Sequence, residues 1–196
     1  MKSLCVYCGS SRGARPEYLE AAATLGETMA RRGIRLVYGA GEVGMMGQVA
    51  KSCLDAGGEV TGITPGNFIT MGVCHGGLTE LIVTDTMHER KAEMSRLSDA
   101  FVALPGGLGT LEEIFEMYTW LQLGLHDRPV GLLNTLGYYG RLLDMLDHQV
   151  AEGFVLSAHR DMLVVEDGVD ALLDRLDQAP PKVGEKWFDK EYHRIR

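Results

Sequence analysis

The sequence predicts a single α/β domain in which a parallel sheet winds in both directions from its centre and carries helices on both faces. Strand-like and helix-like patterns alternate along the chain, with no linker, repeat or low-complexity segment between them. Several strand-like segments are continuous apolar runs, the pattern of strands that are buried on both faces. The chain has 25 glycines and only 6 prolines, which indicates many tight turns between strands and helices. These observations predict a Rossmann-like, doubly wound sheet.

Hydrophobic periodicity and the positions of glycine and proline place each element in order. We expect strands at residues 4–8, 34–38, 59–64, 78–84, 99–104 and 129–133, and helices at residues 16–32, 45–56, 87–98, 110–124 and 138–152. Residues 164–176 are expected to form a last strand–helix pair. Pro16 suits the first turn of its helix, and Gly33 suits the end of it. Residues 64–77 are rich in glycine and are expected to form a loop.

Length and composition limit the class of protein. At 196 residues and 45% hydrophobic content, we expect one domain over residues 1–180, followed by a polar tail over residues 181–196. The net charge of −8 argues against nucleic acid as the main partner, because a phosphate backbone demands an excess of Lys and Arg. No signal-peptide pattern and no membrane-spanning apolar run are present, so a cytoplasmic protein is expected, without a membrane partner.

The cysteines and histidines suggest neither redox nor metal chemistry. Cys5 and Cys8 form a C-x-x-C on the first expected strand, where their odd separation puts the side chains on opposite faces. A redox C-x-x-C belongs at the start of a helix, so ordinary thiols in a reducing compartment are expected. The six histidines show no metal-ligand spacing with Cys, Asp or Glu, and no metal is expected.

Ligands of a doubly wound sheet bind at the carboxyl ends of its strands, near the point where the strand order reverses. This rule directs attention to the loops after the first, second and fifth strands, at residues 9–11, 39–47 and 105–110. Gly9 and Ser10 are therefore candidate binding residues.

The loop after the fifth strand has the features of a phosphate cradle. Its glycines allow close approach of the backbone to a ligand, and the following helix offers unpaired N–H groups to an anion. We expect Thr110 near the cap of this helix and the phosphate on residues 106–110. Glu113, one turn into the helix, would then lie beside the group that carries the phosphate. A carboxylate that is merely favoured by the helix dipole is the alternative.

Residues 39–44 match the G-x-G-x-x-G pattern of dinucleotide-binding sites, but their context does not fit. The acid that binds the ribose should end the following strand, whereas Glu59 begins it. The pattern also follows the second strand, although it normally follows the first. A nicotinamide cofactor is therefore not expected, and no other cofactor is indicated.

Arg90 occupies an unusual position for a cation. In the helix that begins at Met87, the stripe of Met87, Met94 and Leu97 is expected to face inward, and Arg90 falls on that stripe. A cation in such a place needs a carboxylate or a ligand phosphate as its partner. A structural ion pair, or a side chain that extends past the stripe to water, remains the alternative.

The expected helix at residues 110–124 is apolar around most of its circumference, which packing on a sheet alone does not explain. A second protein surface is expected to cover it, and a homodimer is the simplest account. Residues of one subunit could then lie beside the pocket of the other.

The segment from Pro105 to Glu113 resembles the P-G-G-x-G-T-x-x-E signature of the LONELY GUY (LOG) family. The resemblance extends in order through residues 6–11, 36–39, 43–47, 87–92 and 120–134, and covers residues 4–175. Members of this family are cytokinin riboside 5′-monophosphate phosphoribohydrolases, once widely labelled lysine decarboxylases.

The resemblance implies a dimeric Rossmann-like hydrolase that cleaves the N-glycosidic bond of a nucleoside 5′-monophosphate, such as a cytokinin riboside 5′-monophosphate or AMP. It implies Arg90 and Glu113 as the catalytic pair. Carried over by position, the residues that would line the substrate site are Lys91, Gly107, Leu108, Gly109, Thr110, Leu111, Glu112 and Thr119, beside Gly106 of the phosphate cradle. The chain departs from the family pattern at Ala40, at Glu42 and in residues 65–75.

Two other functions are weighed against hydrolysis. A protein of the same fold could carry a nucleotide or a cofactor without cleaving it, because a fold does not determine chemistry. The presence of both Arg90 and Glu113 favours the enzyme. Decarboxylation of an amino acid fits poorly, because no lysine with supporting groups for pyridoxal phosphate is evident.

Overall fold

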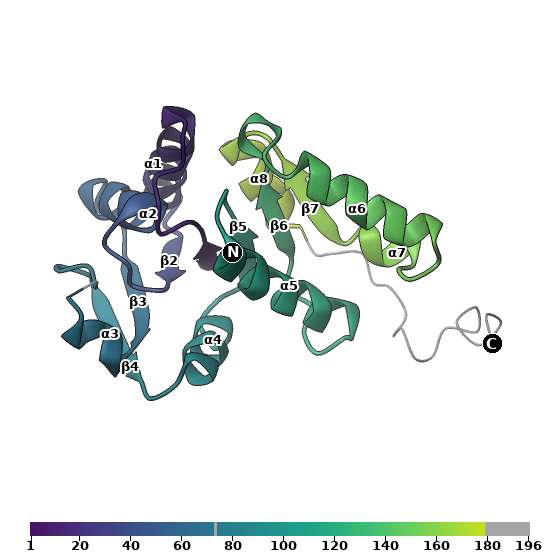
Figure 1. Ribbon diagram of the computed structural model, residues 1–196. Coiled ribbons are helices and arrows are strands. Elements are labelled where there is room, and N and C mark those ends of the chain that lie inside the picture. The colour runs from purple at the N-terminus through teal and green to yellow at the C-terminus, as the bar shows by residue number, and fades with distance from the viewer. Residues whose placement is uncertain (73, 179–196) are drawn as a thin grey trace.

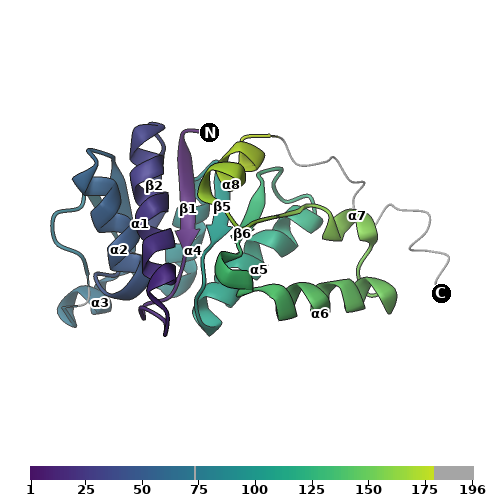
Figure 2. The same cartoon turned by 90° about the horizontal axis from the view of Figure 1, so that it is seen from above.

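The computed structural model describes residues 1–72 and 74–178 as one doubly wound α/β unit (Figure 1). Seven parallel strands form a single sheet in the order β4-β3-β2-β1-β5-β6-β7. The strands are β1 (Ser3–Tyr7), β2 (Arg35–Tyr38), β3 (Val60–Pro65), β4 (Glu80–Thr84), β5 (Ala100–Ala103), β6 (Val130–Leu133) and β7 (Leu163–Glu166). Figure 2 shows β2, β1, β5 and β6 following one another across the molecule. The predicted fold class is confirmed, and the strand order reverses at β1.

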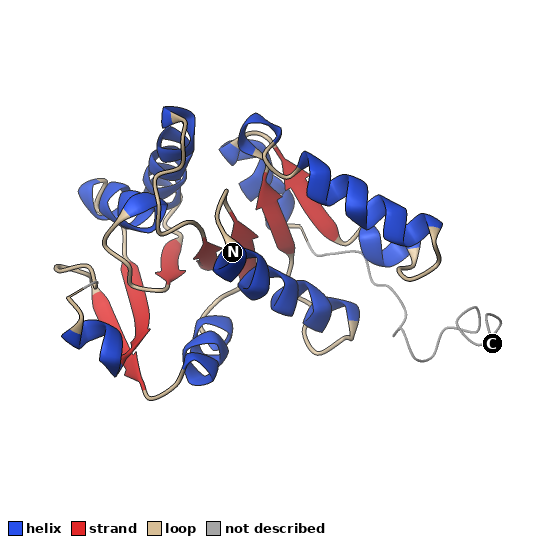
Figure 3. Ribbon diagram, in the orientation of Figure 1, coloured by secondary structure: helices blue, strands red, loops and turns tan. Residues whose placement is uncertain are grey.

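Helices connect the strands and cover both faces of the sheet (Figure 3). They are α1 (Pro16–Arg31), α2 (Gly44–Asp55), α3 (Gly66–Thr70), α4 (Met87–Arg96), α5 (Leu108–Gln122), α6 (Gly140–Ala151), α7 (Ser157–Arg160) and α8 (Val169–Leu176), with a 3₁₀ turn η1 (Thr135–Gly137). Helices α1, α2 and α8 pack on one face, and α4, α5 and α6 pack on the other. No helix among the described residues is long and apolar enough to cross a membrane.

The hydrophobic core is divided between the two faces by the alternation of side chains along each strand. In β1, Leu4 and Val6 join the α1–α2 side, whereas Cys5 and Tyr7 join the α4–α5 side. Cys8 lies on the α1–α2 side, so the two cysteines of the C-x-x-C point to opposite faces, as predicted. Both are buried free thiols. Burial raises the pKa of Cys5 to about 12, which keeps this thiol protonated and unreactive.

Most element boundaries lie within one or two residues of the predictions, and the differences are as follows. Residues 64–77 are not only a loop, because β3 extends to Pro65 and the short helix α3 follows. The helix α7 was not expected, and the helix predicted from residue 138 begins only at Gly140, after the 3₁₀ turn. The helix predicted from Thr110 begins two residues earlier, at Leu108 with Gly107 as its N-cap, and Thr110 lies in its first turn. Met87 does not face inward but is exposed, whereas Met94 is fully buried.

The expected polar tail at residues 181–196 lies outside the described residues.

Candidate functional site

The loops that follow β1, β2 and β5 pack against one another at the carboxyl edge of the sheet. The backbone N–H of Gly9 donates to the carbonyl of Pro105 at 3.1 Å, and the carbonyl of Gly9 accepts from Met45 N–H at 3.1 Å. A Cβ added at Gly44 would lie 2.3 Å from the carbonyl oxygen of Ser10, and Gly44 has a φ of +65°. The three loops are therefore joined backbone to backbone, and glycine is required where they touch.

Helix α5 begins directly after the turn that follows β5, so its first turn lies at the carboxyl edge of the sheet. Gly107 is the N-cap with an extended backbone and no capping side chain, so the first N–H groups of α5 remain free to bind a ligand. A Cβ added at Gly106 would lie 2.1 Å from Oγ1 of Thr110, so glycine lets the turn close over the buried threonine. The hydroxyl of Tyr138 donates to the carbonyl of Gly106 at 2.6 Å and fixes the turn from outside.

Arg90 and Glu113 meet beside this turn. Nη2 of Arg90 lies 3.5 Å from Oε1 of Glu113, and each side chain is only 12% exposed. The Nε of Arg90 donates to the carbonyl of Ile63 at 3.1 Å, which orients the guanidinium along the end of β3. A Cβ added at Gly39 would lie 1.7 Å from Nη2 of Arg90, so glycine after β2 makes room for the guanidinium. Arg90 thus faces inward as the sequence predicts, with a carboxylate as its partner.

Burial gives Glu113 an unusual basicity. Desolvation raises the pKa of the Glu113 carboxyl, and the nearby Arg90 guanidinium offsets this only in part. A carboxylate with a raised pKa binds a proton more readily than an exposed glutamate. Glu113 is therefore suited to accept a proton from water or to stand beside a developing positive charge.

Lys91 is engaged with two carboxylates of α5. Its Nζ donates to Oε1 of Glu112 and, at 3.1 Å, to Glu116, and only 9% of its side chain is exposed. Burial lowers the pKa of Lys91, but the hydrogen bonds with Glu112 and Glu116 outweigh burial and raise it overall. Arg90 and Lys91 are consecutive residues of α4, and each pairs with α5, so the two cations together fix one helix against the other.

Two cavities open at the carboxyl edge, each with a volume of about 310 Å³. The first, which we name the Arg90 cavity, is lined by Arg90, Val43, Met46, Thr64, Phe68 and Cys74, with Gly39, Gly41 and Ser10. The second, which we name the tyrosine cavity, is lined by Tyr18, Tyr138, Gly106, Gly107, Ser10 and Ser11, with Gly9, Gly13, Met45 and Pro105. Ser10 borders both cavities.

The structure brings some of the predicted site residues together and leaves others apart. Gly9, Ser10, Gly106 and Gly107 line the tyrosine cavity, and Arg90 lines the other. Leu108 and Gly109 are exposed in the first turn of α5, and Leu108 is 86% exposed. The remaining predicted residues line neither cavity: Lys91, Thr110, Leu111, Glu112, Glu113 and Thr119. Glu113 reaches the Arg90 cavity only through its contact with Arg90.

Sequence reasoning missed Phe68, Cys74 and Tyr138. The first two come from the segment that was expected to be a plain loop, and Cys74 is held in place by a bridge to Gly41. Tyr138 lies 32 residues from its partner Gly106, so no local pattern could have joined them.

Glu59, the acid of the rejected dinucleotide pattern, lies away from these loops. Glu59 lies immediately before β3, at the amino edge, where it pairs with Arg35 at 2.8 Å. Glu59 therefore lies at the edge opposite to the one where a doubly wound sheet binds its ligands, as predicted. Within residues 1–72 and 74–178, no group of three or more His, Cys, Asp or Glu side chains is placed to hold a metal ion.

Comparison with known proteins places the chain among a recognised group. A family model described as "Possible lysine decarboxylase" matches residues 46–176. The chain is 47% identical to the probable cytokinin riboside 5′-monophosphate phosphoribohydrolase LOGL1 of Oryza sativa subsp. japonica, over 89% of this chain and 78% of the relative. It is 44% identical to the cytokinin riboside 5′-monophosphate phosphoribohydrolase LOG3 of Arabidopsis thaliana, over 92% of this chain and 84% of the relative.

Among solved structures, the Moco carrier protein from Chlamydomonas reinhardtii has the same fold. The TM-score is 0.67 at 23% identity, and the match covers 90% of this chain and 95% of the carrier. At this identity the likeness extends to the fold alone.

Proposed function

The chain belongs to the LONELY GUY (LOG) family, and on that premise we propose that it hydrolyses the N-glycosidic bond of cytokinin riboside 5′-monophosphates or AMP. The products are the free base and ribose 5-phosphate. The observation that carries the proposal is the buried pair of Arg90 and Glu113, which lies at the carboxyl edge beside a glycine turn suited to phosphate. A sheet of this kind binds its ligands at that edge.

The phosphate is held by the start of α5. Free N–H groups of the first turn, at Leu108, Gly109 and Thr110, point toward the anion, and the positive end of the helix dipole favours it. Gly106 and Gly107 allow the phosphate to approach the backbone. This contact fixes the ribose at the carboxyl edge and leaves the base on the side of Arg90.

Hydrolysis then follows from the basicity of Glu113. As the bond between C1′ and the base nitrogen breaks, its electron pair leaves with the base and positive charge develops on the ribose. The Glu113 carboxylate stabilises this charge and accepts a proton from the attacking water, whose oxygen bonds to C1′. The departing base takes up one proton, so that one water molecule is divided between the two products.

Arg90 has two tasks in this proposal. Its positive charge lowers the pKa of Glu113 against the effect of burial, which keeps the carboxyl ionised as a base. Its guanidinium also lines the cavity that receives the base, where it anchors the substrate.

We further propose that the protein is a homodimer that pairs through the outer side of α5. Leu108 and Leu125, at the two ends of this helix, are 86% and 67% exposed. Thr119 and Glu112 are also on exposed positions of α5, where they would face the second copy and its substrate site. Leu125→Glu is expected to give monomers in sedimentation velocity, whereas Val83→Glu on the edge strand β4 is expected to leave the dimer intact. A wild-type monomer at all concentrations would refute the dimer.

We place the reaction in the cytoplasm, where the four free cysteines would stay reduced.

The experiment that tests the reaction is incubation with AMP and with isopentenyladenosine 5′-monophosphate, followed by chromatography of the products. The wild type is expected to release free base and ribose 5-phosphate. Glu113→Gln is expected to reduce turnover by about 10²–10⁴-fold, because a neutral amide can neither accept the proton nor offset the charge. Glu59→Gln, a surface carboxylate at the opposite edge, is the matched control and should retain full activity. Tight binding of intact nucleotide without any product would support a carrier instead.

A further inference from the structure

The first turn of α4 brings a sulfur atom against the guanidinium of Arg90. Sδ of Met87 accepts a hydrogen bond from Nη1 of Arg90 at 3.6 Å. The two residues are three positions apart in one helix, so their side chains lie on the same face. Met87 is 41% exposed, whereas only 12% of the Arg90 side chain is exposed. A thioether that solvent can reach therefore touches the largely buried cation of the candidate site.

Reciprocal capping bonds fix the backbone around Met87. Oγ1 of Thr86 accepts from the backbone N–H of Glu89 at 3.1 Å, and Oε2 of Glu89 accepts from the backbone N–H of Asp85 at 2.9 Å. Such bonds hold the first turn of a helix in one conformation. The approach of the Met87 sulfur to Arg90 is therefore set by the helix itself.

The guanidinium of Arg90 divides its N–H groups among three acceptors of different strength. Nε donates to the carbonyl of Ile63 at 3.1 Å. Nη2 lies 3.5 Å from Oε1 of Glu113, which is longer than the separation of about 2.7–2.9 Å in a close charge-assisted hydrogen bond. Nη1 has the thioether of Met87, and a thioether is a weak acceptor. A stronger acceptor at the Met87 sulfur would compete with Glu113 for the guanidinium.

We propose that Met87 is a site of oxidation by peroxides, and that its sulfoxide draws the Arg90 guanidinium away from Glu113. The proposal rests on the proposed hydrolase function for its effect on turnover, because Arg90 acts in that reaction. A lone pair of the sulfur attacks one oxygen of hydrogen peroxide, so that an S–O bond forms as the O–O bond breaks. The other oxygen leaves with the bonding electrons and takes up the proton of the first as water. The sulfur loses two electrons and the peroxide gains them.

Oxidation converts the weak acceptor into a strong one without any change in the fold. A sulfoxide is polar, and its oxygen accepts hydrogen bonds that a thioether accepts poorly. Its charged donor, Arg90, makes this bond stronger than one between neutral groups. Because Met87 is exposed, the guanidinium would be held toward solvent. The step is reversible, since methionine sulfoxide reductases restore the thioether.

Two other methionines serve as a comparison for this site. Met71 and Met145 are 68% and 52% exposed, so peroxide can reach them as well. Met71 ends α3 and Met145 lies on α6, and neither lines the two cavities at the carboxyl edge. Oxidation of an exposed methionine as such can therefore be separated from oxidation beside Arg90.

The test treats the whole protein with hydrogen peroxide and follows each methionine by peptide mass spectrometry and kcat/KM for AMP by steady-state kinetics. As Met87 sulfoxide accumulates, kcat/KM of the wild type is expected to fall by about threefold to tenfold. Methionine sulfoxide reductase should restore activity, whereas dithiothreitol, which reverses thiol oxidation, should not. Relative to its own untreated sample, Met87→Leu is expected to lose less than about twofold, and the matched control Met145→Leu should lose as much as the wild type.

A second variant and a second readout need no oxidant or no turnover. Met87→Gln places a permanent amide acceptor beside Arg90 and is expected to lower kcat/KM before any treatment. Nitrogen NMR of the Arg90 guanidinium should change when Met87 is oxidised and remain unchanged when only Met145 is.

Three results would overturn the proposal: Met87 that stays reduced while Met145 is oxidised, guanidinium signals that ignore Met87 oxidation, or a loss of activity in Met87→Leu equal to that of the wild type. A loss that follows oxidation of Met46, which lines the Arg90 cavity, would give the third result. An untreated wild type that hydrolyses no nucleotide would refute the proposed function alone, because the mass spectra and the NMR signals would still decide whether Met87 oxidation captures Arg90.

Discussion

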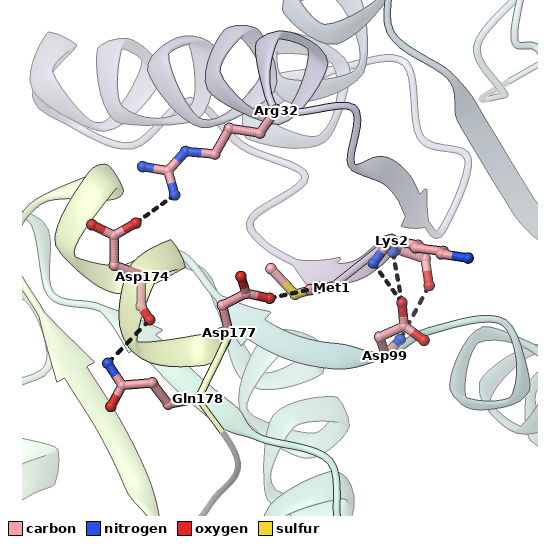
Figure 4. Close-up of polar contacts among 8 residues, drawn as sticks. Met1, Lys2, Arg32, Asp99, Asp174, Asp177 and Gln178 are labelled. Carbon is pink, nitrogen blue, oxygen red and sulfur yellow. Dashed lines mark hydrogen bonds and ion pairs between the residues drawn. The ribbon is translucent and has the colours of Figure 1, made fainter.

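The two edges of the sheet carry charges in opposite ways. At the amino edge the charged side chains are exposed to solvent. Arg32 pairs with Asp170 and Asp174. Asp99 accepts hydrogen bonds from the backbone N–H groups of Lys2 and Ser3; Figure 4 shows these bonds and the pair of Arg32 with Asp174. At the carboxyl edge the cations Arg90 and Lys91 and the carboxylate of Glu113 are almost entirely withdrawn from solvent. Solvated pairs contribute little to stability, whereas buried charges cost desolvation energy unless their partners are well placed.

The difference in solvent exposure between the two edges suggests that the buried charges of the carboxyl edge serve function rather than stability of the fold. Desolvation raises the pKa of Glu113, so its charge is unfavourable to the folded state, although a neutral residue would fit the same space. The carboxyl edge also needs glycine wherever its loops touch, at Gly39, Gly44 and Gly106. Close backbone packing and buried charge concentrated in one place indicate a functional site, and a comparison of matched variants at the two edges can test this.

The largest difference between the two edges is expected in kcat/KM when one arginine of each edge, Arg90 or Arg35, is replaced by alanine. Arg90→Ala removes the partner of Glu113 and a wall of the Arg90 cavity, so kcat/KM for the nucleotide is expected to fall by about 10²-fold or more. Arg35→Ala breaks a solvated pair with Glu59 and should change kcat/KM by less than about twofold. Steady-state kinetics on both variants provide the measurement. Normal activity of Arg90→Ala would assign Arg90 to structure alone.

The next largest difference is expected in the free energy of unfolding, between alanine variants of two glycines with similar backbone conformations. Gly44 and Gly57 have φ values of +65° and +80°, so alanine is strained at both. At Gly44 the new Cβ would also lie 2.3 Å from the carbonyl of Ser10, whereas nothing lies within 4 Å at Gly57. Gly57→Ala is expected to lower the free energy of unfolding by about 1 kcal/mol, and Gly44→Ala by about 3 kcal/mol or more with loss of activity. Equal losses in urea titrations would show that the loops at Ser10 can move apart.

An element of the fold or of the candidate site could be predicted from the sequence when the residues that form it are neighbours in the chain. Buried apolar runs predict the parallel strands because each run is local, and the cradle from Gly106 to Glu113 lies within eight residues. The start of α5 was misplaced because threonine is a favoured N-cap, whereas the observed cap is Gly107 with no side chain to signal it. The helices α3 and α7 have 5 and 4 residues, too few for periodicity to show.

The candidate site was predictable only in part for the same reason. Arg90 stands out because a cation on an apolar stripe is a local anomaly, but its partner Glu113 is on another helix. The Lys91 contacts with Glu112 and Glu116 could not be anticipated, because they depend on how α4 and α5 cross. The pairing of Phe68 and Cys74 with Arg90 depends on the path of a glycine-rich segment that has no periodic pattern.

The pH dependence of stability should have opposite signs at the two edges. Burial raises the pKa of Glu113 in the folded protein, so the folded state favours the neutral carboxyl. The resulting stabilisation is fully present below the unfolded pKa of about 4.3, and it is lost as the pH rises through the folded pKa. Glu113→Gln keeps a neutral side chain at every pH, so its Tm is expected to exceed that of the wild type at neutral pH, with the difference vanishing in acid.

Asp99 supplies the opposite case. Burial alone would raise its pKa, but hydrogen bonds from the backbone N–H groups of Lys2 and Ser3 outweigh burial and lower it. Its ionised form therefore stabilises the fold above the unfolded pKa of about 3.9, and this contribution is lost as pH falls through the folded value. Asp99→Asn is expected to lower Tm at neutral pH and to converge with the wild type in acid. Thermal scans of both variants from acid to neutral pH test the signs, and a lower Tm for Glu113→Gln at neutral pH would contradict the view of Glu113 as a destabilising charge.

The smallest change in the free energy of unfolding is expected for Arg32→Ala. The change should depend on salt at this amino-edge residue but not at Arg90 on the carboxyl edge. Arg32 contacts Asp170 and Asp174 at 2.6 Å each, but these carboxylates are 74% and 67% exposed. Arg32→Ala should therefore cost about 1 kcal/mol or less at low ionic strength, and this loss should shrink as salt screens the pairs. The pair of Arg90 and Glu113 is shielded from ions by burial, so the stability change caused by Arg90→Ala should be nearly independent of salt. Urea unfolding of both variants at low and high salt measures the difference; a large, salt-independent loss at Arg32 would mean that the amino edge also depends on its charges for the fold.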